Sequence, residues 1–111
     1  MKYEELVERV RKATQNVKVS RAIDHLAFQF NIEGEAEGAF YIEIVTGKVN
    51  VEPYEYYDRD IIVVTTADIL LQIVEGKLQA MAAYTNGELK VYGNVDLIKY
   101  IPVCYDGKNE V

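Results

Sequence analysis

The sequence contains one cysteine, one histidine and one serine, and this scarcity excludes several kinds of active site. A hydrolase needs a nucleophile, a base and an orienting group, which Ser20, Cys104 and His25 do not supply in any recognisable arrangement. Asp24 precedes His25, but consecutive side chains on a strand point to opposite faces and so form no dyad. A zinc site needs three or four nitrogen or sulfur ligands, and His25 and Cys104 are the only ones here. The sequence therefore predicts a protein that is not an enzyme and holds no cofactor.

The sequence also lacks any apolar run long enough to cross a membrane. The longest aliphatic run is Ile61 to Val64, whereas a membrane helix needs about 20 apolar residues. The N-terminus is charged and amphipathic, without the apolar stretch of a secretory signal. A lone Cys104 makes no intrachain disulfide, which favours a reducing compartment. We therefore expect no integral membrane segment and a cytoplasmic location.

Positive charge is in short supply, since 12 Lys and Arg face 18 Asp and Glu for a net charge of −6. Nucleic-acid backbones recruit clustered basic residues. The densest basic cluster, at residues 9–12, is interleaved with acids at helical spacing, and its pairs Glu5 with Arg9 and Glu8 with Lys12 predict support within one helix. We expect no nucleic-acid partner.

Acidic residues gather between the first two predicted strands, at Glu33, Glu35 and Glu37. The segment lacks the ligand spacing of a calcium loop, and an acidic turn is commonly just a solvated turn. We therefore predict no metal site.

Apolar periodicity in the first half predicts a helix followed by three strands. From Tyr3 the apolar positions recur every three or four residues, which is typical of an amphipathic helix. From Asp24 the period becomes two, so that one side of the strand is apolar and the other faces water. The apolar side carries Leu26, Phe28, Phe30 and Ile32, and the water side Ala27, Gln29, Asn31 and Glu33. Two further alternating segments, 40–44 and 49–51, follow short turns and complete an antiparallel meander.

The segment 53–60, "PYEYYDRD", interrupts the alternation and is long enough for a crossover. Its tyrosines combine a large apolar ring with a polar hydroxyl. They either pack as a lid on the sheet edge or contact a partner or ligand. The sequence leaves both interpretations open.

The second half predicts a strand, two helices, a strand and a last helix. Ile61 to Val64 is apolar on both faces, as suits a strand deep in the sheet. Thr65 and Asp68 resemble a capping box for a helix that ends at Gly76. The remaining elements are a short helix over about 78–85 that Asn86-Gly87 ends, a strand through 89–92, and a helix that Asn94 caps.

The 111 residues suit one domain, 1–111, without internal repeats. The predicted fold is α+β: a five-stranded, mainly antiparallel sheet in the order α-β-β-β-crossover-β-α-β, with helices covering one face.

The stretch "GKLQAMAAYTNGELKVYGN", residues 76–94, resembles the signature of the sterol carrier protein 2 type domain. The matching features are Gly-Lys-Leu, a short helix that ends in Ala-aromatic, a glycine, an alternating strand and Gly-Asn. Residues 28–51 are similar to that family's first three strands, and 60–77 to its fourth strand and following helix. The family often has proline where Ala80 stands and a basic residue where Glu88 stands, and both departures are mild.

The resemblance implies a noncatalytic carrier that holds a hydrophobic ligand, fatty acyl, isoprenoid or sterol-like, between the sheet and the helices. The alanines at 80, 82 and 83 would leave room for it, and Tyr84, Lys90 and Tyr92 would stand at its mouth. The expected ligand-binding residues are Phe28, Phe40, Ile42, Ile44, Leu70, Ile73, Met81, Tyr84, Ile98 and Ile101.

Two alternatives remain open at this point. The same apolar residues would equally fill an ordinary core, since any α+β core needs such stripes. The chain would then be a protein-interaction or dimerisation module, a homodimer included, with no lipid ligand.

Overall fold

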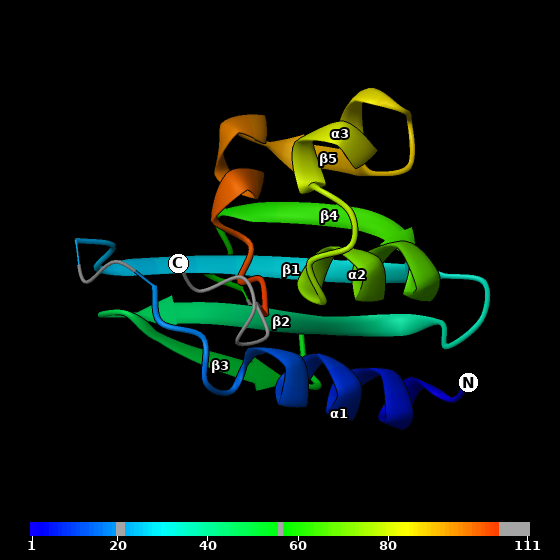
Figure 1. Ribbon diagram of the computed structural model, residues 1–111, viewed down its shortest axis with the longest axis horizontal. Helices are drawn as coiled ribbons and strands as arrows, with labels where there is room; N and C mark the ends of the chain where they lie inside the picture. The colour runs from blue at the N-terminus through cyan, green and yellow to red at the C-terminus, as the bar shows by residue number, and fades with distance from the viewer. Residues whose placement is uncertain (20–21, 56, 105–111) are drawn as a thin grey trace.

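The computed structural model describes residues 1–19, 22–55 and 57–104, which form an open sheet with helices on one side (Figure 1). The sheet order is β3-β2-β1-β4-β5. β1 and β4 are parallel, and the other neighbouring pairs are antiparallel. This arrangement confirms the predicted α+β sheet and its meander. The strands are β1 (His25–Glu33), β2 (Gly38–Val45), β3 (Lys48–Glu52), β4 (Ile61–Thr66) and β5 (Lys90–Gly93).

Figure 1 places the helices in front of the sheet, with α1 along the β3 side and α3 and η1 near β4 and β5. Their bounds are α1 (Tyr3–Thr14), α2 (Ala67–Val74), α3 (Ala80–Thr85) and η1 (Val95–Tyr100), the last a 3-10 helix. The Asn94 side chain accepts a hydrogen bond from Asp96 N at 3.1 Å, so the predicted cap of the last helix is confirmed.

The core lies between the helices and the sheet face that carries three stacked phenylalanines. The ring centroids of Phe28 and Phe30 are 6.1 Å apart, and those of Phe30 and Phe40 are 5.5 Å apart. All three side chains are completely buried. The alternation fixes this register, because a slip of one residue would move every ring to the face of the sheet away from the helices.

The opposite face of β1 is less exposed to water than its alternation predicted. Ala27 is 0% and Gln29 3% exposed, so the expectation of one fully wet face was wrong. Asp60, the last residue of the crossover from β3 to β4, lies beside Ala27 and binds its backbone. Asp60 N donates to Ala27 O at 2.9 Å, and Ala27 N donates to Asp60 Oδ2 at 2.8 Å.

The N-terminal cap of α2 is one residue later than predicted. Thr66 Oγ1 accepts a hydrogen bond from Ile69 N at 3.3 Å, which makes Thr66 the cap. Thr65 is a buried residue of β4, one before its end, and its hydroxyl donates to Glu88 O at 2.9 Å. Thr65 therefore joins β4 to the chain before β5 instead of starting the helix.

Polar contacts hold α1 against two other elements, β3 and the end of α2. Arg11 donates to Val51 O on the edge strand β3, with its Nη2 at 2.9 Å. Arg9 Nη2 lies 2.9 Å from Glu75 Oε2 at the end of α2, so Arg9 pairs across helices and not with Glu5 as predicted. These contacts tie the helix to both sides of the core.

Tyr3 anchors the start of α1 on β2, where its hydroxyl donates to Ala39 O at 2.5 Å. Its ring also fills the space where a side chain at Gly38 would lie, 2.5 Å from an added Cβ. Burial, and secondarily the charge of Glu4, raises the pKa of Tyr3 above its usual value.

Tyr3→Phe is expected to lower the free energy of unfolding by about 1 kcal/mol at neutral pH, because one partly buried hydrogen bond is lost. The pKa of Tyr3 is higher in the folded state than in the unfolded state. Its contribution to the free energy of unfolding is therefore fully present below about pH 10 and is lost as the pH rises through the pKa of the folded state. Urea unfolding should therefore show a smaller difference between wild type and variant in alkaline buffer than at neutral pH. The matched control is Tyr57→Phe, since Tyr57 is 94% exposed.

Candidate functional site

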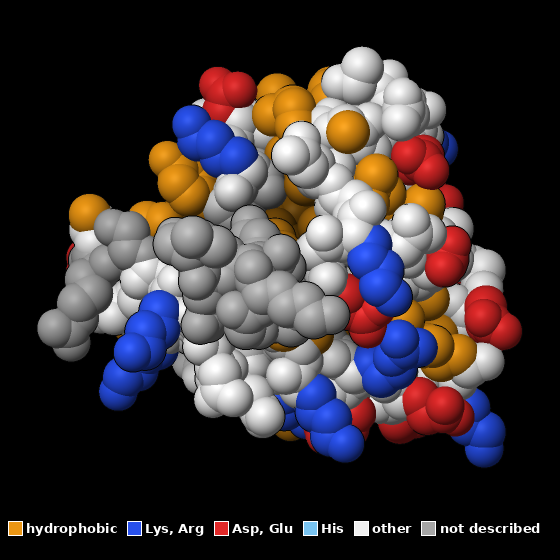
Figure 2. Space-filling model, viewed as in Figure 1, with side chains coloured by type: hydrophobic (Ala, Val, Ile, Leu, Met, Phe, Trp, Pro, Cys, Tyr) orange, Lys and Arg blue, Asp and Glu red, His pale blue; other side chains and the backbone are white. Residues whose placement is uncertain are grey.

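A small cavity of about 220 Å³ opens between α3 and η1. Its lining residues are mostly apolar, and two of the seven, Gln79 and Lys99, have polar side chains. Figure 2 shows hydrophobic side chains reaching the surface over this end of the molecule. The lining residues are Gln79, Ala80, Met81, Ile98, Lys99, Ile101 and Val103.

The depth of the cavity follows from the burial of its walls. Ile98 and Ile101 are 0% and 3% exposed and form the inner wall, whereas Met81 is 39% exposed and lies towards the opening. In a 3-10 helix, residues three apart lie on the same side. Ile101 follows η1 directly and its N–H donates to Ile98 O at 3.1 Å, so the two isoleucines keep this spacing and both are buried, whereas Lys99 is exposed.

The chain after η1 returns to the end of α2 and completes the cavity wall at Val103. Cys104 N donates to Val74 O at 2.6 Å, which fixes this return. Gly76 makes the approach feasible, because a Cβ there would lie 3.0 Å from Cys104 O and its φ is +81°.

The small residues of α3 have three different environments. Ala83 is fully buried against the core, Ala80 is partly buried and lines the cavity, and Ala82 is exposed. The idea that all three make room for a ligand is therefore wrong for Ala82. A side chain larger than alanine at position 80 would narrow the cavity.

The ten residues expected to bind ligand occupy three kinds of position. Met81, Ile98 and Ile101 line the cavity. Tyr84 is 39% exposed on α3 and is absent from the lining. The six others are buried in the core: Phe28, Phe40, Ile42, Ile44, Leu70 and Ile73.

The predicted mouth residues Lys90 and Tyr92 lie away from the cavity. They pair with Val64 and Ile62, on the side of the sheet opposite the buried Val63. Gln79 and Lys99 are the polar residues at the cavity instead, and the prediction missed both. Lys99 stands between two apolar residues that the periodicity identified, so it looked like an ordinary exposed helix position.

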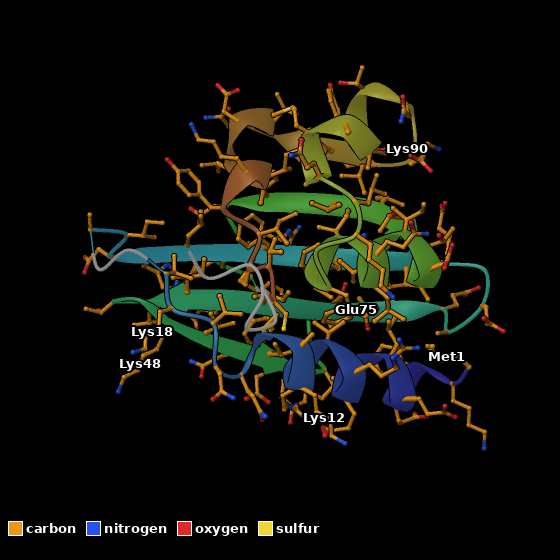
Figure 3. All side chains as sticks on the ribbon, viewed as in Figure 1. Met1, Lys12, Lys18, Lys48, Glu75 and Lys90 are labelled. Atoms are coloured by element: carbon orange, nitrogen blue, oxygen red, sulfur yellow. The ribbon has the colours of Figure 1, made fainter. Side chains whose placement is uncertain are left out.

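Three other hollows formed by described residues have charged or polar walls. One of about 210 Å³ lies between α1 and α2 around the Arg9–Glu75 pair, and one of about 290 Å³ lies beside Lys90. A third, of about 490 Å³, lies around Lys18 and Lys48, which gather at one corner of the molecule in Figure 3. Size alone does not identify a lipid site, and the walls of the cavity at α3 and η1 suit an apolar ligand better.

Tyr54 and Tyr57, the two described tyrosines of the crossover, are not packed as a lid. Tyr54 is 63% and Tyr57 94% exposed, and Tyr56 lies outside the described residues. The exposure of these two rings favours contact with a partner over packing on the sheet edge. His25 lies at the start of β1, with Nε2 2.7 Å from Glu43 Oε2.

Within residues 1–19, 22–55 and 57–104, no group of three or more His, Cys, Asp or Glu side chains is arranged to hold a metal ion. Among the helices of these residues, none combines the length and the hydrophobicity that a bilayer crossing requires.

Comparison with known proteins gives one family and several structural neighbours. The model of the SCP-2 sterol transfer family matches residues 4–101. Hydroxysteroid dehydrogenase-like protein 2 of Homo sapiens is 30% identical over 82 residues, which cover 73% of this chain and 19% of that protein. The chain thus spans about a fifth of the length of the curated relatives it matches.

Two solved structures have the same fold. A UbiJ-SCP2 ubiquinone synthesis protein aligns with a TM-score of 0.65 at 17% identity, covering 88% of this chain and 87% of that one. Sterol Carrier Protein 2 Like 2 from Aedes aegypti aligns with a TM-score of 0.56 at 21% identity, covering 85% and 87%. At these identities the likeness concerns the fold.

Proposed function

The chain belongs to the SCP-2 sterol transfer family, and from this premise we propose that it is a noncatalytic carrier of a hydrophobic molecule. The observation that carries the proposal is the apolar cavity between α3 and η1. Residues 1–111 would act as one lipid-binding domain, with Ile98, Ile101 and Met81 in contact with the ligand.

The size of the cavity bears on the ligand. Its 220 Å³ hold about seven groups of the size of a water molecule, at about 30 Å³ each. Sites for larger ligands commonly measure about 300 to 1,000 Å³. A segment of an acyl or isoprenoid chain fits as the cavity stands, whereas a sterol ring system requires α3 and η1 to move apart.

The six buried predicted residues enter this proposal only if such an opening occurs. Phe28, Phe40, Ile42 and Ile44 lie on the sheet beneath the helices, with Leu70 and Ile73 on α2 above them. A ligand longer than the cavity would displace contacts among these side chains.

The first test is native mass spectrometry of freshly purified protein, followed by organic extraction. The proposal expects a hydrophobic molecule close to one per chain, or a rise in melting temperature with added fatty acid or isoprenoid alcohol, since a ligand of the folded state alone stabilises it. A clean mass without stabilisation by either ligand would overturn it.

Ala80→Phe is expected to reduce binding of such a ligand at least tenfold, because the new ring occupies the cavity that Ala80 lines. Ala82→Phe is the matched control, since Ala82 is on the same helix but exposed, and it should bind like wild type. Fluorescent fatty-acid titration measures both. Equal affinity of the two variants would place the ligand elsewhere.

A second function, contact with another protein, is favoured by the exposed Tyr54 and Tyr57. Exposed aromatic rings are enriched in protein interfaces. The partner could be a second copy of the chain, which would make a homodimer. Analytical ultracentrifugation tests this by comparing the sedimentation of wild type with that of a Tyr54→Ser, Tyr57→Ser double variant.

A further inference from the structure

The two edges of the sheet differ in what covers them. Along β3 lies α1 (Figure 1), whose Arg11 side chain donates to Val51 O, with Nη2 at 2.9 Å and Nε at 3.3 Å. The other edge strand is β5. Among the described residues, nothing apart from β4 forms a hydrogen bond with the backbone of Lys90–Gly93. Since unpaired N–H and C=O groups at an edge are where a sheet accepts another strand, β5 is the open edge.

The residues of β5 are accessible on this edge. Gly93 is exposed, and because it has no side chain its exposed surface is backbone. Val91 is half-buried against the core, whereas Tyr92 is 61% exposed on the opposite side of the sheet. Lys90 lies on the side of Tyr92, since successive strand residues alternate. Within the described part of the chain, Lys90 makes no ion pair within 4.0 Å, so its ammonium group is available to a partner.

We propose that β5 pairs in antiparallel fashion with β5 of a second copy of this chain, which joins the two sheets about a two-fold axis at Val91. A two-fold contact repeats each residue pair. Val91 therefore lies opposite Val91 of the second copy, and Lys90 lies opposite Tyr92 in both directions. This surface is distinct from the crossover that carries Tyr54 and Tyr57, and the inference does not depend on the carrier function.

The side chains of β5 select this register and this partner. Opposed residues of antiparallel strands have Cβ atoms about 4.5 to 5.5 Å apart, so each Lys90 ammonium group meets the opposing Tyr92 ring in a cation–π contact. A shift of two residues one way sets Lys90 against Lys90, and opposed like charges destabilise a sheet. The same shift the other way sets Val91 against Gly93 and takes Lys90 away from the ring. Centred on Val91, the strand is complementary to itself.

Sedimentation of the wild-type chain at rising concentration is the first experiment, and it should show a dimer. Tyr92→Lys sets a second cation opposite Lys90 at both pairs and removes both rings, so it should raise the dissociation constant at least tenfold. The exposure of Tyr92 means that the monomer should keep its fold, which circular dichroism checks. Tyr57→Lys is the matched control, since it makes the same change at a ring that is 94% exposed on the crossover, and it should dimerise like wild type.

Cross-linking tests the register in a Cys104→Ser background, which removes the native thiol. Opposed Cα atoms on antiparallel strands are about 4.5 to 5.5 Å apart, within the range of about 4.4 to 6.8 Å that a disulfide spans. Mild oxidation should therefore link two chains through Val91→Cys. Tyr92→Cys is the matched control: the two copies of position 92 would be two residues out of register and about 8 Å apart, too far for a disulfide. It should stay unlinked although it is the more exposed position.

The outcomes decide between this surface and its alternatives. A chain that stays monomeric at rising concentration overturns the inference, and leaves β5 to an extended segment of another protein. A dimer that survives in Tyr92→Lys also overturns it, and loss of that dimer in Tyr57→Lys would place the contact on the crossover. Equal cross-linking at positions 91 and 92 overturns the register. The carrier function is tested by ligand binding, so neither result decides the other.

Discussion

Phe30→Ala is expected to lower the free energy of unfolding by about 4 kcal/mol, within the usual range of about 3 to 5 for a buried phenylalanine. Phe30 is completely buried on β1, the middle strand of the sheet. It stacks on Phe28 and Phe40, so its loss leaves both neighbouring rings without a partner on one side. Closing that space would require the sheet and the helices to approach each other, which the paired strands resist.

Urea denaturation followed by circular dichroism measures the effect. Tyr92→Ala is the matched control, since it removes an aromatic ring from the same sheet but at a position 61% exposed. It should change the free energy of unfolding by well under half as much. A loss below about 2 kcal/mol for Phe30→Ala would contradict the packing described for this core.

The sequence predicted the sheet well because β1 and β2 each carry a strictly alternating row of large apolar residues that is buried. Phe28, Phe30 and Phe40 mark the buried row by strict alternation, and a register slip would move them to the opposite face of the sheet. Gly76 and Gly87 mark helix ends, where both adopt positive φ values that other residues avoid. These signals are local, so they can be read without knowledge of the fold.

Contacts between distant segments were not predictable in the same way. Both residues at the start of α2 are threonines, and either could cap the helix. The hydroxyl of Thr65 donates instead to the Glu88 carbonyl, 23 residues further on, which leaves Thr66 as the cap. Arg9 had a suitable partner in Glu5 at helical spacing, yet it pairs with Glu75 because α1 packs beside the end of α2. Local pairing rules therefore identified the helix but not its ion pairs.

The site was harder to predict than the fold for a related reason. Apolar periodicity selects every residue that faces the interior, and it does not distinguish a filled core from a cavity wall. Phe40 and Ile98 are equally buried, but only Ile98 lines the cavity. Where the packing leaves space depends on how α3 and η1 lie against each other, and that arrangement also makes Lys99 one of the lining residues.

Asp60→Ala is expected to lower the free energy of unfolding by about 2 kcal/mol, because it leaves the Ala27 N–H without its acceptor in a fully buried residue. Asp60 Oδ2 accepts that hydrogen bond just before β4 begins, while Asp60 N donates to Ala27 O. The pair ties the end of the crossover to the middle strand, and the parallel pairing of β1 with β4 follows directly after it at Phe28 and Ile61.

Two companion variants distinguish this role from a change of net charge. Asp58→Ala removes the same charge from the exposed part of the crossover and should stay within about 0.5 kcal/mol of wild type. Asp60→Asn keeps an oxygen acceptor but loses the stronger hydrogen bond that a charged group makes, so it should fall between the two. Hydrogen exchange gives a local readout, since the Ala27 amide should exchange faster in Asp60→Ala than in Asp60→Asn. Equal stability of Asp60→Ala and Asp58→Ala would contradict this role of the carboxylate. The backbone hydrogen bond from Asp60 N to Ala27 O would then suffice to hold the end of the crossover.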